Sequence, residues 1–585
     1  MAFSILKNSR DFVSKKQETI LSGALVFIIA TTATKLIGII KLVLLANMFG
    51  TSRSLDMFYA ANTLPEIIFT LLVTGSINTA IIPVFSKFTG KKSDEFNSVF
   101  SKLFTFASLL LSVLALIGIV FAPFIVKALV DFGISKPTPP FNAFEFAEMS
   151  EMIRILFISP FILGLSFILT GILMVHKRFI ITQIASVMYS LGFILSIFIF
   201  VPFFGVIGLC WGVVLGSVFH LIVQLPVIKM LGIDFKFDFN FKNNYLIEML
   251  RLFSPRVLGL LGEQLSVLVD TILAIGLISG SLSAFKYAYT IYLIPVVVVG
   301  LSIAQAAFPV LVEEYSLGKI DSFKKNFSKS LQQILFFSIP LAIIITVLRL
   351  PLVRLLGIGK DTMLGWDGTL ATAWVLFFFG LNIIFQSVIA LLIRGFYAMQ
   401  NTKVPLRASL ITVIVNLFLS IYLVKVFGNF SAYRGVIGNF MHINLLPSFV
   451  SGSNGWMAVG GLSLASTITS FIVLIYMGSV FKKSIGGLKR DEFKIPLIKK
   501  VVSGGVMGIA MYGVYILLDS LINTSHTIEL IFLIAIVCYV GISVYIFLAY
   551  FLEDEESELI SKIAGKIKNI LLMKENVNVI QSVTQ

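Results

Sequence analysis

Cysteine, histidine and charge are all scarce in this chain of 585 residues. It contains 2 cysteines and 4 histidines, and 13% of its residues are charged. Two isolated thiols, Cys210 and Cys538, give neither a disulfide framework nor a metal cluster, and the histidines lack the spacing of metal ligands. We therefore expect no metal site and no redox chemistry.

Catalytic motifs are lacking as well. The sequence contains no Walker, GxSxG or HExxH motif and no polar stretch long enough for a nucleotide-binding domain. It therefore predicts no enzyme, no catalytic residues and no cofactor. Transport by such a chain would depend on an ion gradient or on the membrane potential, with Na⁺ or a proton as the coupling ion.

Apolar residues are abundant instead. They make up 57% of the chain, and the mean hydropathy is +0.98, which is typical of an integral membrane protein. Backbone amides in lipid must be bonded within their own segment, so each long apolar run is expected to be a helix. Runs long enough to cross a bilayer predict fourteen transmembrane helices, at 20–49, 58–86, 101–130, 152–175, 179–203, 205–230, 247–278, 283–312, 327–356, 369–398, 404–427, 456–480, 496–521 and 527–551.

The distribution of basic residues predicts the orientation. They gather in segment 1–19 and in the loops after even-numbered spans, for example at Lys91, Lys92, Lys324 and Lys325. By the positive-inside rule, both termini are expected in the cytoplasm. The net charge of +15 then reflects many cytoplasmic loops, and it does not indicate a nucleic-acid partner.

The chain also matches itself. AIIPVF at 80–85 matches AAFPVL at 306–311, and FSK at 100–102 recurs at 327–329. Six spans are repeated in the same orientation, which predicts an all-α fold with two parallel six-helix bundles, 20–230 and 247–480, around a central cavity. A cytoplasmic linker is expected at 231–246 and an external insertion at 429–455. Two extra helices and a cytoplasmic tail should fill 481–585.

Charged residues inside the apolar spans are candidates for function, because burying charge in a bilayer is costly. The cations Lys35, Lys41, Arg256 and Lys286 could hold an anionic substrate, although each lysine could also reach the membrane interface with its ammonium. The carboxylates Glu66, Glu263 and Asp270 would suit a coupling ion, and Arg256 and Glu263 could instead form a structural ion pair. Arg256, Glu263 and Asp270 are seven residues apart and should share one face of a helix.

Prolines and glycines interrupt the second, seventh and eighth spans. They are either bending points for alternating access or inert kinks. The six residues are Pro65, Gly75, Pro255, Gly259, Pro295 and Gly300.

Two regions of the sequence resemble one known family. Residues 34–88 contain LIGIIK, ANMFGTS, DMFYA and IIPVFS, and a second patch begins with SPRVLGLLGEQ at 254–264. They resemble the MurJ/MviN family of lipid II flippases, in the multidrug/oligosaccharidyl-lipid/polysaccharide exporter superfamily. The resemblance implies a bacterial plasma-membrane protein that moves a lipid-linked anionic substrate, with membrane lipids and cell-wall synthesis proteins as partners and an oligomeric state left open.

The resemblance also implies a cationic cavity and adds Asp56 to the substrate-binding candidates. Lys35 and Lys41 stand where the family typically has arginine, while Phe69, Thr70 and Thr290 replace further arginines. These replacements leave three readings open: a divergent lipid II flippase, a flippase or cation-coupled exporter for another lipid-linked glycan or amphiphile, and an inactive cell-wall scaffold.

Overall fold

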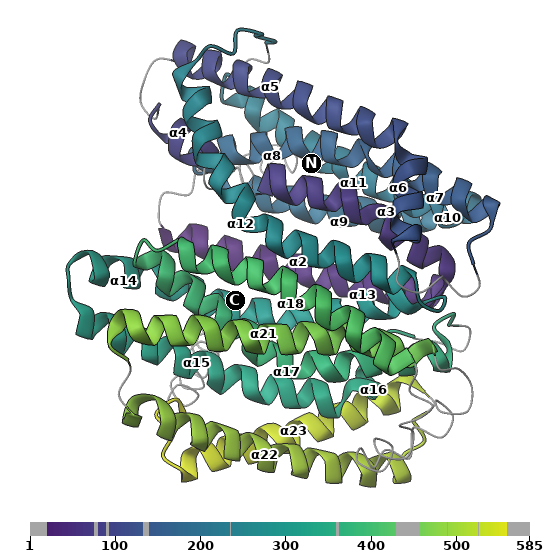
Figure 1. The fold of residues 1–585 in the computed structure, drawn as a ribbon, viewed down its shortest axis with the longest axis vertical. Helices are drawn as coiled ribbons and strands as arrows, with labels where there is room; N and C mark the ends of the chain where they lie inside the picture. Colours follow the sequence, from purple (N-terminus) through teal and green to yellow (C-terminus); the bar gives the residue numbers. More distant parts are fainter. Residues whose placement is uncertain are drawn as a thin grey trace, which may run out of the picture. The chain divides into compact units, whose positions relative to one another are not determined.

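The computed structural model describes residues 20–74, 80–88, 93–132, 140–233, 236–357, 362–428, 455–487, 490–524 and 526–557 (Figure 1). All regular elements in these ranges are helices, and each predicted apolar run contains helix. Among the described residues, eleven helical segments are long and apolar enough to cross a membrane. The all-helical membrane fold is therefore confirmed, whereas the count of fourteen spans stays a prediction.

Most predicted spans correspond to long helices. These are α2 (Ile20–Phe49), α9 (Phe179–Ile199), α11 (Ile207–Met230), α12 (Asn244–Ile275), α17 (Gly365–Ala398), α18 (Lys403–Gly428), α21 (Gly455–Ile485), α22 (Arg490–Leu521) and α23 (Thr527–Phe551). The span predicted at 152–175 is longer than expected, because it comprises α7 (Ala143–Leu156) and α8 (Ile158–Val175). The short helix α10 (Val201–Phe204) follows α9. Residues 429–454 of the predicted insertion at 429–455 lie outside the described residues.

Two spans predicted as single helices are broken, so those predictions were wrong. The run at 101–130 contains α5 (Ser93–Val120) and α6 (Ala122–Asp131), and the run at 327–356 contains α15 (Ile320–Val347) and α16 (Arg349–Arg354). Pro123 lies in the first turn of α6, where a missing N–H costs little. The matching helix ends are 227 residues apart, which supports the internal duplication.

The predicted run 58–86 is also interrupted, and its interruption recurs in the second half of the chain. In the first half α3 (Arg53–Phe69) leads into the π-helix η1 (Thr70–Thr74), with α4 (Ile82–Ser86) further along. In the second half α13 (Ser281–Pro295) leads into η3 (Val296–Leu301) and α14 (Ser302–Ser316). Proline removes a helical hydrogen bond, and π-turns accommodate such defects. The two π-helices begin 226 residues apart, at Thr70 and Val296, so they lie at equivalent positions of the repeat.

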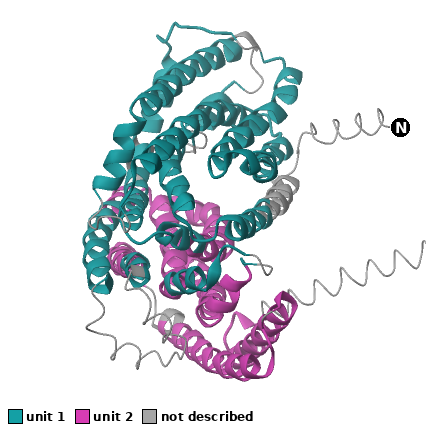
Figure 2. Ribbon diagram, turned by 90° about the vertical axis from the view of Figure 1, so that its right-hand side faces the viewer, with its two compact units in different colours: residues 1–287, 356–375, 409–465 teal, residues 288–355, 376–408, 466–585 magenta. Residues whose placement is uncertain are grey.

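The chain forms two compact units (Figure 2). Unit 1 comprises residues 1–287, 356–375 and 409–465, and unit 2 comprises 288–355, 376–408 and 466–585. These units do not test the boundaries predicted for the two six-helix bundles, 20–230 and 247–480, which stay a prediction.

Within unit 1, α11 packs against α8 and α9, and α2 packs against α9. Its apolar core includes Phe85, Phe100 and Leu169, which are fully buried. Polar side chains form a seam between the parallel helices α8 and α11: Ser159 meets Ser217 at 2.7 Å, and Ser166 meets Nδ1 of His220 at 2.6 Å. Such buried groups are hydrogen-bonded to one another because lipid offers them no partner.

Within unit 2, α22 and α23 pack on each other and α15 packs on α22. Phe336, Met507, Met511 and Leu533 belong to their shared core. At the end of this helix pair, the Lys500 ammonium is buried and lies 2.8 Å from carboxylate oxygens of both Asp554 and Glu556. The two helices predicted after the repeat, α22 and α23, therefore belong to unit 2 and pack beside α15.

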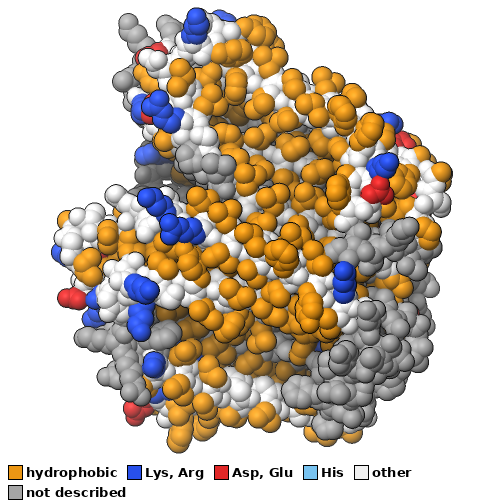
Figure 3. Space-filling model, viewed as in Figure 1, with side chains coloured by type: hydrophobic (Ala, Val, Ile, Leu, Met, Phe, Trp, Pro, Cys, Tyr) orange, Lys and Arg blue, Asp and Glu red, His pale blue; other side chains and the backbone are white. Residues whose placement is uncertain are grey.

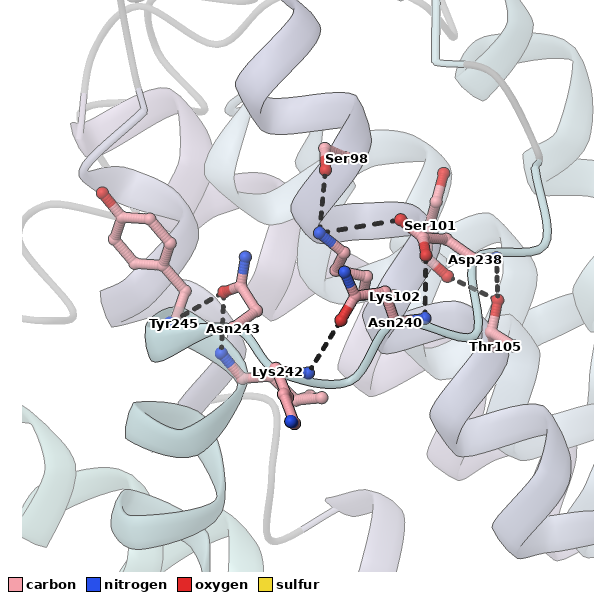
Figure 4. Close-up of polar contacts among 10 residues, drawn as sticks. Ser98, Ser101, Lys102, Thr105, Asp238, Asn240, Lys242, Asn243 and Tyr245 are labelled. Carbon is pink, nitrogen blue, oxygen red and sulfur yellow. Dashed lines mark hydrogen bonds and ion pairs between the residues drawn. The ribbon is translucent and has the colours of Figure 1, made fainter.

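The predicted linker at 231–246 is shorter than expected, because α12 begins at Asn244 (Figure 4). Asn243 caps this helix: its side-chain oxygen accepts from the amides of Tyr245 and Leu246. The Asp238 amide donates to Thr105 of α5, and the Asp238 carboxylate lies 3.6 Å from the Lys102 ammonium. The linker is therefore held against α5.

Candidate functional site

Asp56 is buried at the start of α3 and bonds the first turn of α13. Its Oδ2 accepts from the Gly280 amide at 2.6 Å, and its Oδ1 accepts from both the amide and the hydroxyl of Ser283 at 2.6 Å. Exposed backbone amides at a helix N-terminus favour an anion. The Asp56 carboxylate therefore acts as a cap supplied by another helix.

The turn before α3 is packed tightly against the same region. Tyr287 is fully buried and donates to the Gly50 carbonyl at 2.7 Å. Gly50 has φ +55°, and a Cβ there would lie 1.9 Å from the Met363 carbonyl oxygen. Gly280 has φ +88°, and its Cβ would lie 2.2 Å from the Thr51 carbonyl oxygen. We call Gly50, Thr51, Asp56, Gly280, Ser283 and Tyr287 the α3–α13 clamp.

A second polar group lies along α2, α3 and α9. Lys41 is half-buried, and its ammonium lies 4.5 Å from the centre of the Phe193 ring. The Glu66 carboxylate is close enough to Lys41, Tyr59 and Tyr189 to act on each through its charge. The predicted cation Lys41 and the predicted carboxylate Glu66 are therefore neighbours, each charge partly compensating the other.

Asp270 lies on α12 and is buried, with 8% of its surface exposed. Its Oδ1 accepts from the Asn416 amide at 3.0 Å and from the Ser420 hydroxyl at 3.4 Å. Asn416 and Ser420 are four residues apart on α18 and so share one face. The Lys286 ammonium also acts on this carboxylate through its charge.

The other predicted site residues are dispersed. Lys35 and Glu263 have exposed side chains, and Lys286 is half-buried. Asp270 is buried while Glu263 is exposed. The two carboxylates on this face of α12 therefore lie in different environments. Gly300 packs closely on α17, since a Cβ there would lie 2.6 Å from the Ser387 Cα. The side chains of Arg256, Pro255 and Gly259, and all of Gly75, lie outside the described residues.

Phe69, which stands where the family typically has an arginine, packs against other aromatic rings. Phe69 makes an edge contact with Phe167, with ring centroids 5.0 Å apart, and Phe167 stacks on His220 at 4.8 Å. Thr70 begins η1. An arginine at position 69 would have to be accommodated beside these rings, so the replacement changes the electrostatics of this part of unit 1.

Unit 2 contains a large apolar groove with a volume of about 1040 Å³. Side chains of α15, α17, α21 and α22 form it, including Leu335, Ile339, Val388 and Leu474. Hydrophobic side chains dominate the face of the molecule in Figure 3, where basic side chains occur in small groups. Lys482 and Lys494 line one end of the groove.

Comparison with known families decides the assignment. The family model for "Lipid II flippase MurJ" matches residues 45–535. The chain belongs to this family. Curated relatives named "Probable lipid II flippase MurJ" include one from Buchnera aphidicola (subsp. Acyrthosiphon pisum), 25% identical over 79% of this chain and 84% of its own, and one from Rhizobium tropici, 27% identical over 70% and 75%.

Solved structures agree on the MurJ-type fold. The structure titled "Lipid II flippase MurJ, inward closed conformation" matches with a TM-score of 0.69 and 21% identity, over 91% of this chain and 99% of the other. An inward-facing multidrug MATE transporter of the MOP superfamily matches with a TM-score of 0.57 and 14% identity, over 77% and 94%. At these identities both matches bear on the fold alone.

Several residues at these sites were not found from the sequence. Gly280 lies within a Ser-Gly-Ser stretch at 279–281 that signals a helix start, and Ser283 follows it. Nothing local connects these residues to Asp56, which is 224 and 227 residues away. Asn416 and Ser420 stand out as polar residues at helical spacing in an apolar run. That signal was available in the sequence.

Proposed function

We propose that this chain moves lipid II from the inner to the outer leaflet of the bacterial plasma membrane by alternating access. The observation that carries the proposal is the family match across residues 45–535. A lipid-linked anionic cargo fits a membrane protein with a cation, Lys41, half-buried between apolar helices. We also propose that both termini lie in the cytoplasm, because the basic residues gather in the loops on that side.

The proposed substrate-contacting residues are Lys35, Lys41, Arg256 and Lys286. Lysine attracts phosphate as a point charge, and it lacks the bidentate geometry of arginine. Asp56 has a different proposed role. Both of its carboxylate oxygens already accept hydrogen bonds from α13, so it acts on transport by holding the α3–α13 clamp closed.

The clamp and the paired breaks together support a gating mechanism. The α3–α13 clamp lies at the ends of α3 and α13 that the charge rule places outside, and Pro65 and Pro295 precede π-turns farther along the same helices. Opening at the outer side would break the Asp56 bonds, while the breaks allow each helix to bend. Pro255, Gly259, Gly75 and Gly300 are proposed as further bending points.

Coupling to a cation is proposed at Asp270. A carboxylate, an amide and a hydroxyl converge there from α12 and α18, and a rotated Asn416 amide would add a second oxygen for Na⁺. Binding of a proton to Asp270, in place of Na⁺, would couple transport to a proton gradient. Glu66 and Glu263 are weaker candidates because both are exposed. Asp270→Asn should remove the dependence of transport on the Na⁺ or proton gradient. The control Glu248→Gln, which removes an exposed carboxylate paired with Lys87, should leave that dependence unchanged.

Complementation tests the cargo. The gene should restore growth to a strain depleted of its lipid II flippase, and failure by a protein shown to be inserted would contradict the proposal. The replacements at Phe69, Thr70 and Thr290 favour a second candidate, a flippase for another lipid-linked glycan or amphiphile. That candidate predicts no rescue together with accumulation of a different lipid-linked precursor when the gene is deleted. Association with cell-wall synthesis proteins is proposed on the family resemblance.

A further inference from the structure

We propose that the C-terminal helix pair α22–α23 braces α15 at Pro340, so that the three helices move as one body during transport. The Tyr545 hydroxyl of α23 takes the place of the backbone amide that Pro340 lacks. All three helices belong to unit 2, where they pack on one another (Figure 1). The consequence for transport rests on the proposed function, whereas the brace is a feature of unit 2 alone.

Pro340 interrupts the hydrogen bonding of α15. It lies inside the helix Ile320–Val347, and proline has no backbone N–H to donate to the carbonyl four residues earlier. That carbonyl belongs to Phe336, which is 1% exposed. In a membrane no water replaces the lost donor, so this carbonyl needs another partner within the protein.

Tyr545 supplies that partner. Its hydroxyl donates to the Phe336 carbonyl oxygen at 3.0 Å, and the tyrosine is itself buried. The two rings are also in contact, with centroids 5.4 Å apart. A buried tyrosine hydroxyl normally needs a hydrogen-bond partner, so one bond satisfies both groups. The contact joins α23 to α15 at the carbonyl that the proline frees.

Close packing holds α22 on the same stretch of α15. A Cβ at Gly504 would lie 2.7 Å from Cγ2 of Ile339 and 2.9 Å from Cδ1 of Ile343. These two isoleucines therefore fill the space that a side chain at position 504 would take. Gly541 of α23 likewise packs against Met511 of α22, and small residues permit such close approach between membrane helices. The three helices are thus in mutual contact around the proline.

The equivalent helix of the first repeat differs in both respects. α5 and α15 begin and end 227 residues apart, which aligns Pro340 with Val113. Phe336 aligns in the same way with Leu109. Val113 has a backbone amide to donate, and Val113 and Leu109 are 53% and 44% exposed. The proline and the helices that compensate for it therefore occur together in the second repeat.

A double-mutant cycle on the melting temperature of the full-length protein in detergent tests the brace. Tyr545→Phe should lower the melting temperature by roughly 2–4 °C, because it removes the donor to a buried carbonyl. Pro340→Ala restores the backbone amide, so adding Tyr545→Phe to it should lower the melting temperature by less than about 1 °C. Equal losses in the two backgrounds would overturn the proposal. Tyr539→Phe removes an exposed hydroxyl from the same helix and should leave the melting temperature unchanged.

A disulfide between α15 and α22 tests the motion as one body. Ile339→Cys/Gly504→Cys joins the two helices where their side chains meet, in a background of Cys210→Ala/Cys538→Ala. The amount of lipid II that an externally added enzyme can cleave should be the same with the reduced and the oxidised protein. If oxidation forms the bond and stops transport, the helices move apart in the cycle and the proposal is overturned. This arm also decides if Pro340→Ala does not fold.

The two arms separate this proposal from the proposed function. If the wild-type chain moves no lipid II, the proposed function fails, and the melting-temperature cycle still decides whether Tyr545 compensates for Pro340. If the wild-type chain transports and the cycle shows no coupling between the two residues, the brace alone is wrong.

Discussion

Asp56 and Ser283 are joined by two hydrogen bonds, since one carboxylate oxygen accepts from both the amide and the hydroxyl of Ser283 at 2.6 Å. The two residues lie on different helices, 227 positions apart. A buried anion is stable there because the first turn of α13 offers it unsatisfied amides. The contact therefore holds α3 and α13 together within unit 1.

Replacing Asp56 should destabilise the protein as well as stop transport. Asp56→Ala leaves the amides of Gly280 and Ser283 without acceptors, and we expect a loss of roughly 2–4 kcal/mol in the free energy of unfolding. Ser283→Ala removes the hydroxyl bond alone and should cost about 1.5 kcal/mol. Thermal melting in detergent would measure both. If Asp56 instead contacted the cargo directly, Asp56→Ala would weaken lipid II binding without lowering the melting temperature.

Gly50 should tolerate no side chain. Gly50→Ala would place its Cβ 1.9 Å from the Met363 carbonyl oxygen at a positive φ, and we expect it to cost at least about 4 kcal/mol. Gly318→Ala is a matched control, because Gly318 has φ +69° with open space around it; it should cost roughly 1–2 kcal/mol from backbone strain alone. Equal melting temperatures for the two variants would show that the packing of the α3–α13 clamp is not tight.

Lys41 should be required for transport as a cation. Lys41→Gln is expected to abolish complementation, whereas Lys41→Arg keeps the charge over Phe193 and should retain it. The loss of the contact with Phe193 should lower stability by about 1 kcal/mol, too little to prevent folding. Lys87→Gln removes an exposed lysine that pairs with Glu248 at 2.5 Å and should complement normally. Normal growth with Lys41→Gln would remove Lys41 from the proposed site.

Stability should fall as the pH rises toward neutrality. Burial and the neighbouring Asp554 raise the pKa of Glu556 to about 7. The folded protein then binds this proton more tightly than the unfolded chain, so the stabilisation is complete below the ordinary pKa of 4.5 and is lost as the pH passes about 7, with a slope of at most about 1.4 kcal/mol per pH unit.

Melting temperatures between pH 5 and pH 8 would measure this effect. Glu556→Gln should flatten the dependence, and Glu555→Gln, at the exposed neighbouring position, should leave it unchanged. An unaltered slope in Glu556→Gln would assign the dependence to another group.

Local sequence patterns predicted helix content well and helix breaks poorly. Each apolar run contains helix because lipid leaves the backbone no other partner, and the repeat is visible in matching helix ends. The breaks at Phe121 and Leu348 were missed, although Pro123 and Pro351 follow them closely, because hydropathy averages over a break of one residue. A proline suited to the first turn of a new helix was the sequence signal that could have indicated these two breaks.

The candidate site was only partly predictable. Asp56, Lys41 and Asp270 are conspicuous as charges near or within apolar runs, but their partners come from helices far away in sequence. Asn416 lies 146 residues from Asp270, and no spacing rule connects such pairs. The apolar groove of unit 2 is formed by four helices, so its shape follows from packing that composition alone does not determine.

The central claim, that this chain flips lipid II, is tested most directly by measuring lipid II at the outer leaflet. In cells depleted of their own flippase and expressing this chain, an externally added enzyme that cleaves lipid II should release its product. The release should stop with Lys41→Gln and persist with Lys87→Gln. If lipid II accumulates in the cells and stays inaccessible to that enzyme while the protein is correctly inserted, the account is contradicted.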